Sequence, residues 1–96
     1  MRSIAPLLAV ALLAGCASID AQRSLAQAEV SLEGARAAGA EKLAPYEYTS
    51  AEALYQKARE ENGRARYNDA VDHARRAARM ADQARTQATG PRPEEK

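Results

Sequence analysis

The sequence has 96 residues and a mass of 10.3 kDa, enough for one small domain and too few for a large enzyme with a deep pocket. Its formal net charge is +1, so the composition gives no general signal for nucleic-acid binding. One Cys and one His exclude an intrachain disulfide framework and a Cys/His metal cluster. We therefore expect no metal ion and no bound cofactor.

Residues 1–15 have the pattern of a secretory signal peptide. Arg2 supplies a positive charge, and an uncharged, mostly apolar run of about 11 residues follows from Ile4 to Ala14. A helix that spans a membrane needs about 20 such residues, so this run is too short to cross a bilayer. The run continues into Gly15 and the single cysteine of the chain.

Residues 13–16, Leu-Ala-Gly-Cys, resemble the bacterial lipobox. The resemblance implies a diacylglyceryl group on the sulfur of Cys16, cleavage between Gly15 and Cys16, and acylation of the new amino group by a fatty acid such as palmitate. Each buried CH₂ contributes about 0.8 kcal/mol, so several acyl chains anchor stably in a bilayer. Residues 16–18 would then be the lipidated N-terminus.

The residue after the cysteine, Ala17, bears on the membrane that receives the anchor. In Gram-negative lipoproteins, Asp at this position tends to retain the protein at the inner membrane. The resemblance therefore implies a lipid-anchored protein on the periplasmic face of the outer membrane. In a Gram-positive organism, the same lipobox implies the outer face of the cell membrane.

Residues 19–89 form the candidate helical domain. The chain contains 24 Ala, the residue with the highest helix propensity, and only eight large aliphatic side chains lie beyond position 15. We expect an all-α fold, an antiparallel bundle or hairpin of about three Ala-rich helices that pack closely through small residues. Because so thin a core is marginal for a lone monomer, self-association or a partner helix would help.

The first helix is expected over residues 19–43. Apolar or small residues recur there at heptad-like spacings of four and three, which is typical of one buried helix face. These residues are Ala21, Leu25, Ala28, Leu32, Ala35 and Gly39. Pro45 then interrupts the pattern, because proline lacks a backbone donor and disfavours helix at the residue before it.

Two starts are open for the second helix. It begins either at Pro45, since proline suits the first helical position, or at Ser50, after a capping box with Thr49 as N-cap and Glu52 reaching back. The expected end is near residue 62, where Gly63 offers a C-cap. The stripe expected to be buried is Tyr48, Ala51, Tyr55, Ala58 and Asn62.

The third helix is expected from Tyr67 to Thr89 and has the strongest periodicity in the chain. Its stripe follows spacings of three and four without a slip: Tyr67, Ala70, Ala74, Ala77, Ala81, Ala84 and Ala88. Gly90 and Pro91 end the helix, and residues 90–96 are expected to form a disordered polar tail.

The pattern of residues 17–88 resembles short bacterial lipoproteins that share the helical domain of unknown function 4398. The matching pieces are Ala44-Pro45, then Ala51, Leu54 and Ala58, then Tyr67-Asn68-Asp69-Ala70, then Ala74, Ala77, Ala81 and Ala84. The family usually has Gly-Asp before the tyrosine, whereas this chain has Ala65-Arg66. The resemblance implies a periplasmic, membrane-anchored helical module with no established activity and no catalytic residues.

The only histidine, His73, lies beside the Ala stripe of the third helix. As a general base it would need a nucleophile and an orienting group, and the sequence offers no GxSxG motif, second histidine or reactive cysteine. We therefore interpret it as a boundary histidine and the chain as non-enzymatic.

Three arginines, Arg75, Arg76 and Arg79, cluster on the expected outer face of the third helix. They could bind anionic lipid headgroups or cell-wall carboxylates. Aspartates interleave with them, however, and Asp72 and Arg76 have the spacing of a helical ion pair, so a solvated face is the favoured interpretation. The four tyrosines could stack on cell-wall sugars, but we favour packing, in which their large rings fill gaps that Ala leaves.

The last residue of the sequence, Lys96, suggests a second function. Murein lipoproteins of enteric bacteria also combine an N-terminal lipid with a terminal lysine that is joined to peptidoglycan. Their shaft is one unbroken helix, whereas Pro45 and Gly63 interrupt this chain. We thus expect an outer-membrane interaction or structural module that contacts the bilayer and an envelope protein or a second copy. A peptidoglycan tether through Lys96 is the alternative.

Overall fold

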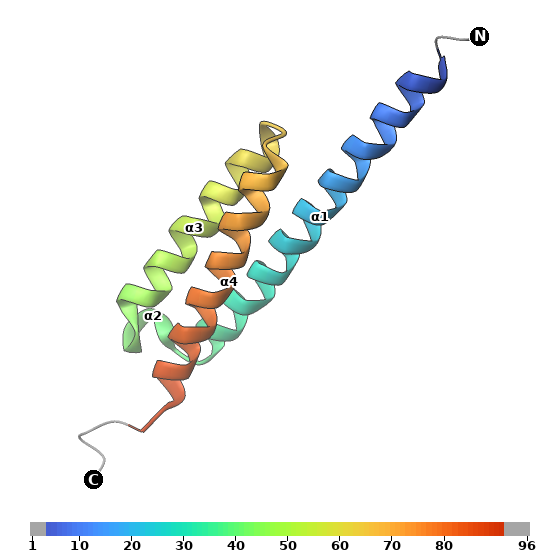
Figure 1. Cartoon of the computed structure of the whole chain (residues 1–96). Helices are drawn as coiled ribbons and strands as arrows, with labels where there is room; N and C mark the ends of the chain where they lie inside the picture. The colour runs from blue at the N-terminus through green and yellow to red at the C-terminus, as the bar shows by residue number, and fades with distance from the viewer. Residues whose placement is uncertain (1–3, 92–96) are drawn as a thin grey trace.

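The structure is a computed structural model that describes residues 4–91. The residues from position 4 to 91 form helices and short connections without a strand, as the sequence predicts. The helices are α1 (Ile4–Ala37), α2 (Ala40–Leu43), α3 (Pro45–Gly63) and α4 (Tyr67–Thr89), arranged along one elongated body (Figure 1). The molecule measures 74 × 16 × 15 Å. Predictions for Arg2, for Lys96 and for the tail beyond position 91 lie outside the described residues.

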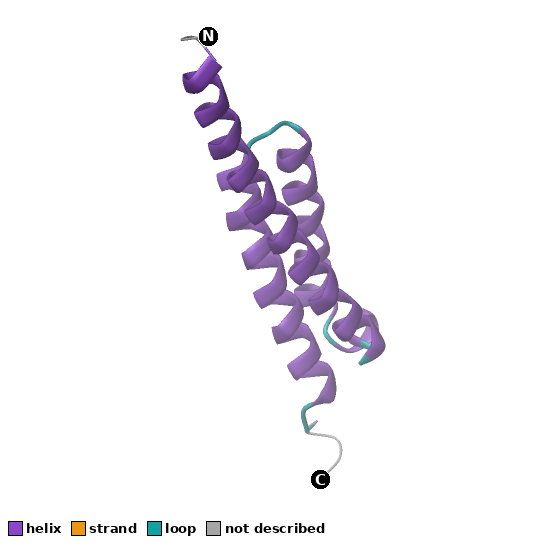
Figure 2. Ribbon diagram, turned by 90° about the vertical axis from the view of Figure 1, so that its right-hand side faces the viewer, coloured by secondary structure: helices purple, strands orange, loops and turns teal. Residues whose placement is uncertain are grey.

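The helices run down, up and down, so α3 is antiparallel to both α1 and α4, and α1 is parallel to α4 (Figure 1). Helix α4 packs extensively against both other long helices, whereas α1 and α3 touch each other less. The two connections that reverse the chain lie at opposite ends of the bundle (Figure 2). The first turns of α1 project past the α3–α4 hairpin (Figure 1).

Helix α4 is central because its buried stripe consists only of alanine. The predicted stripe is confirmed, with each alanine from Ala70 to Ala88 at or near zero exposure. Ala78 is buried beside the stripe. A methyl group at each seam position lets the backbones of α1 and α3 approach α4 closely. On α1, the predicted stripe is confirmed at Ala21, Ala28, Leu32 and Ala35, which are all buried.

The prediction for the first helix is wrong at both of its bounds. Helix α1 begins at Ile4, because the leucine and alanine of the apolar run also favour helix. It ends at Ala37, and Gly39 adopts the left-handed conformation, with φ of 80°. Glycine occupies this region without steric cost, so the chain turns there instead of continuing to Leu43. The single turn of α2 follows as a corner.

The structure decides where α3 starts. Pro45 occupies its first turn, and the backbone N–H of Tyr48 donates to the carbonyl of Ala44 at 3.0 Å. The alternative start at Ser50 is therefore wrong, and Thr49 lies inside the helix, where it cannot be an N-cap. No side chain caps this helix; proline fills a position whose N–H would have no helical partner.

The end of α3 also differs from the prediction. Gly63 remains helical, and Ala65 takes the left-handed conformation, with φ of 60°. The N–H of Arg66 donates to the carbonyl of Glu61 at 2.8 Å, and the N–H of Ala65 donates to that of Asn62 at 3.1 Å. These two bonds form a Schellman motif whose left-handed position is occupied by alanine. Glycine, which the sequence resemblance places at this position, would fit it better.

Candidate lipid-attachment site and surrounding helix surfaces

The predicted lipid-attachment residue, Cys16, lies on α1 with its thiol exposed. After Cys16, the first fully buried residue along α1 is Ala21, five positions later, which corresponds to about 7.5 Å along a helix. An acyl group on Cys16 would therefore not displace a core side chain. Among the described residues, no helix combines the length and hydropathy needed to cross a membrane.

The packing of α1 on α4 places Cys16 at one end of the bundle. An ideal Cβ on Gly34 would lie 3.2 Å from Nη1 of Arg85, so these two positions are level in the parallel helices. Cys16 precedes Gly34 by the same number of residues as Tyr67 precedes Arg85, so Cys16 is level with Tyr67, the first residue of α4. The residues before Cys16 thus form the part of α1 that projects beyond the hairpin.

His73 joins α4 to α3 in the half of the bundle that contains Cys16. Its Nδ1 lies 2.6 Å from Oε1 of Glu61 and 3.0 Å from the carbonyl oxygen of Asp69. Both partners are acceptors, so Nδ1 carries the proton. The His73 and Glu61 side chains are only 19% and 13% exposed. The boundary position predicted for His73 is confirmed, whereas its partner Glu61 was missed because the pairing depends on how the hairpin closes.

Polar side chains occupy the contact between α1 and α3. Nε of Arg36 donates to the hydroxyl of Tyr48 at 3.0 Å, and its Nη1 pairs with the Glu33 carboxylate. The hydrogen bond to Tyr48, and then that to Glu33, raise the pKa of Arg36. Burial raises the pKa of the Tyr55 phenol, and the nearby Glu29 carboxylate adds to this. These larger groups explain why α1 and α3 approach each other less closely than either approaches α4.

The tyrosines differ in environment. Tyr48 is buried, and Tyr55 and Tyr67 are half-buried, in agreement with the predicted packing role. Tyr46 contradicts that prediction because it is 74% exposed. It lies in the first turn of α3 and lines a surface hollow between α3 and α4, outside the core cluster that contains Tyr48 and Ala51.

The α4 arginines are exposed, as the sequence predicts. The expected ion pair between Asp72 and Arg76 is absent: within residues 4–91, the ion pairs are Arg36–Glu33 and His73–Glu61. Three surface hollows flank the arginines: one of about 350 Å³ between α1 and α4, one of about 310 Å³ between α3 and α4, and one of about 410 Å³ on α4 beside Asp72 and His73. Arg79 lines all three. The described part of the chain also lacks a cluster of metal-binding side chains.

Comparison with known proteins identifies the helical domain. The model of DUF4398, a domain of unknown function, matches residues 23–92, which is well over half of the chain. The chain belongs to the DUF4398 family. The resemblance to this helical domain seen in the sequence is thus confirmed. No curated protein and no solved structure matches the chain.

The DUF4398 match has a clear relation to the helices. It begins seven residues after Cys16 and includes the bundled part of α1, the α2 corner and the α3–α4 hairpin. The lipobox-like segment lies outside the match. The bundle and the candidate anchor are therefore separate features of the chain.

Proposed function

We propose that this DUF4398 protein is a lipid-anchored protein of the bacterial envelope, held at the periplasmic face of the outer membrane. Its helical bundle would be a non-enzymatic interaction or structural module. The observation that carries the proposal is the lipobox-like sequence that ends at Cys16, whose thiol is exposed at one end of the bundle. Acylation there would attach the bundle to a bilayer without altering its core.

The anchor can be tested by metabolic labelling with an alkyne-tagged palmitate. The wild-type protein should take up the label. Because Cys16 is the only cysteine, the Cys16→Ser variant has no thiol to carry a lipid, so it should stay unlabelled and keep residues 1–15. Mass spectrometry of the N-terminal peptide should show acylation and cleavage after Gly15. An unlabelled, unprocessed wild-type protein would contradict the anchor.

The proposed outer-membrane location can be tested by substitutions of Ala17. Ala17→Asp should move the labelled protein from the outer-membrane fraction to the inner-membrane fraction, and Ala17→Ser should leave it in place. Wild-type protein in the inner membrane would contradict the proposed location.

The proposed interaction role predicts specific contacts in the cell. Large exposed apolar side chains such as Val30 and Leu43 offer contact area that a lone bundle leaves in water. Crosslinking in intact cells, followed by purification of the lipidated protein, should show envelope partners or self-oligomers. Recovery of the monomer alone would count against this role.

A peptidoglycan tether through Lys96 is the second candidate. It is favoured by the positions of the helix ends. Cys16 is level with Tyr67, where α4 starts, and α4 runs from there to Thr89 at the other end of the bundle (Figure 1). A lipid and a wall attachment could therefore act at the two ends of one rod. Sacculi boiled in SDS should retain the wild-type protein and lose a chain without Lys96; loss of both would exclude a covalent tether.

A further inference from the structure

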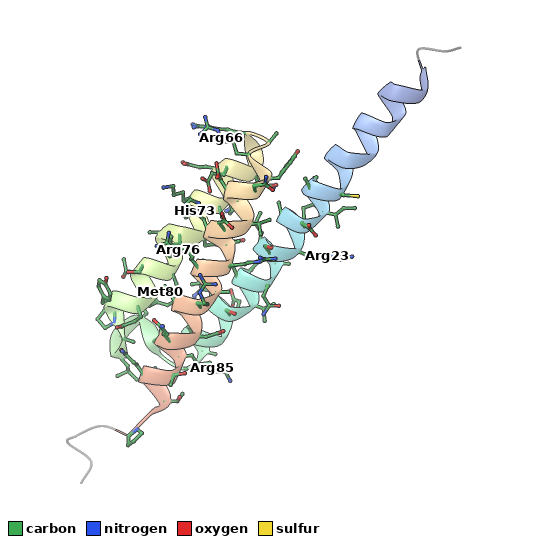
Figure 3. All side chains as sticks on the ribbon, in the orientation of Figure 1. Arg23, Arg66, His73, Arg76, Met80 and Arg85 are labelled. Carbon is green, nitrogen blue, oxygen red and sulfur yellow. The ribbon has the colours of Figure 1, made fainter. Side chains whose placement is uncertain are left out.

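A groove between α3 and α4 combines an aromatic ring, an apolar floor and positive charge. Its volume is about 310 Å³, and Leu54 and Met80, both half-buried, supply the apolar surface. Arg76 and Met80 lie on the same side of α4, one turn apart (Figure 3). The full lining is Tyr46, Ser50, Leu54, Arg76, Arg79, Met80 and Gln83.

Tyr46 is the unusual member of this lining. It leaves 74% of its surface in water, whereas the other three tyrosines are buried or half-buried. Its neighbour two positions later, Tyr48, already fills the core, so packing does not account for Tyr46. An exposed ring at the mouth of a groove offers a flat apolar surface to a ligand while its hydroxyl stays hydrated.

The polar groups of the groove are mainly hydrogen-bond donors. Arg76 and Arg79 make no ion pair with an acid anywhere in residues 4–91. The hydroxyl of Ser50 and the amide of Gln83 lie on the same lining. Guanidinium groups present their N–H donors in a planar fork that matches a carboxylate, and such charge-assisted bonds are stronger than neutral ones.

We propose that this groove binds a carboxylate-bearing amino sugar, as found in cell-wall glycan strands from which the stem peptide has been removed. The sugar ring would lie on Tyr46, its carboxylate on Arg76 and Arg79, and its neutral polar groups on Ser50 and Gln83. The inference rests on the proposed periplasmic location and names the partner of the bundle. Because no residue of α1 lines the groove, attachment through Cys16 leaves it open.

A phosphate group would also match two arginines. The exposed ring and the apolar floor favour a ring-shaped ligand over a lipid phosphate, however, and phospholipid binding is therefore an outcome that the test must separate. This distinction sets the choice of probes.

The test measures binding of N-acetylmuramic acid and N-acetylglucosamine, which share a ring but differ in the carboxylate, to the purified full chain in detergent. Saturation-transfer NMR should detect the acid, and the neutral sugar should bind at least about tenfold more weakly, since a hydrogen bond to a charged group is being lost. Tyr46→Ala should weaken binding of both sugars. Arg76→Gln combined with Arg79→Gln should abolish the preference for the acid.

A matched control removes two positive charges elsewhere. Arg64→Gln combined with Arg66→Gln removes two positive charges from the α3–α4 turn, as many as the groove variant loses, and should leave sugar binding unchanged. All substituted side chains are exposed, so helix content by circular dichroism should match that of the wild type. Equal loss in the control pair would mean non-specific charge attraction and would overturn the proposal.

Two other results would also overturn it. Equal binding of the two sugars would remove the role of the arginines. Binding of phosphatidylglycerol vesicles or inorganic phosphate through Arg76 and Arg79, without sugar binding, would assign the groove to phosphate. The Cys16→Ser variant should keep sugar binding, because no residue of α1 lines the groove. In the wild-type protein, sugar binding without palmitate labelling refutes the anchor alone, and labelling without sugar binding refutes the groove alone.

Discussion

Replacing Ala65 by glycine is expected to stabilise the bundle. Ala65 has a φ of 60°, a conformation that costs a non-glycine residue about 1–2 kcal/mol. Glycine removes this cost but adds about 0.4–1 kcal/mol of chain entropy to the unfolded state. The net gain is about 0.5–1 kcal/mol in the free energy of unfolding. For a domain of this size, that corresponds to a rise in Tm of about 2–8 °C.

The matched variant lies two positions earlier. Gly63 is helical, and a Cβ built on it meets nothing within 4 Å. Gly63→Ala should therefore also stabilise the chain, by up to about 1 kcal/mol, because alanine favours helix. Thermal and urea unfolding followed by circular dichroism at 222 nm would measure both variants, and the double variant should be close to additive or better.

The opposite pattern would refute this account of the turn. If glycine were required at position 63, Gly63→Ala would destabilise the chain and Ala65→Gly would have little effect. Two variants that differ only in which position gains or loses a methyl group thus decide between the cap expected from sequence and the Schellman motif of the structure.

Three further predictions concern the core, the α3–α4 pair and alkaline pH. Ala77→Leu places a larger side chain at a fully buried seam position and should lower the free energy of unfolding by about 1–3 kcal/mol. Ala26→Leu, at an exposed position, should change it by less than about 0.5 kcal/mol. Urea unfolding measures both variants. A double-mutant cycle with His73→Ala and Glu61→Ala should show a coupling of at least about 0.5 kcal/mol, and purely additive effects would refute the pair. Burial raises the pKa of Tyr55 above its ordinary 10.0, so the unfolded phenol ionises first as pH rises past that value, and the stability that this group contributes below it is lost. Tyr55→Phe should therefore reduce the fall in stability above pH 10, measured as the difference in urea midpoint between the two proteins.

The candidate sites differ in how far sequence reasoning reached them. Cys16 is a candidate from local sequence alone, because a lipobox-like pattern is a short continuous segment that a protease and a transferase would bind in extended form. Glu61 was missed as the partner of His73, since nothing in the local sequence relates two residues on different helices. The prediction that Tyr46 packs is wrong: it assumed that every tyrosine ring fills a gap left by alanine, whereas at this end of α3 only Tyr48 enters the core.

The all-α class and the bounds of α4 followed directly from the amino-acid sequence. Alanine favours helix at every position, and an uninterrupted spacing of three and four from Ala70 to Ala88 defines one buried face without knowledge of its partners. Local patterns were insufficient at the helix ends. Gly39 could either continue or end α1, and Gly63 and Ala65 compete to be the left-handed residue of the α3–α4 turn; each is compatible with either a helix or a turn in isolation.

Packing of the whole chain resolved that competition. Helix α1 ends where the α2 corner returns the chain to α3, with Gly39 left-handed, and α3 ends where the chain returns as α4, with Ala65 left-handed. The central place of α4 has the same origin: both neighbours approach its methyl seam closely, while larger polar groups hold α1 and α3 apart. Residue type thus determined which face of each helix was buried. Contacts between helices determined which of these faces met. The buried stripe follows from the residue spacing within one helix, whereas register and closure depend on several helices at once.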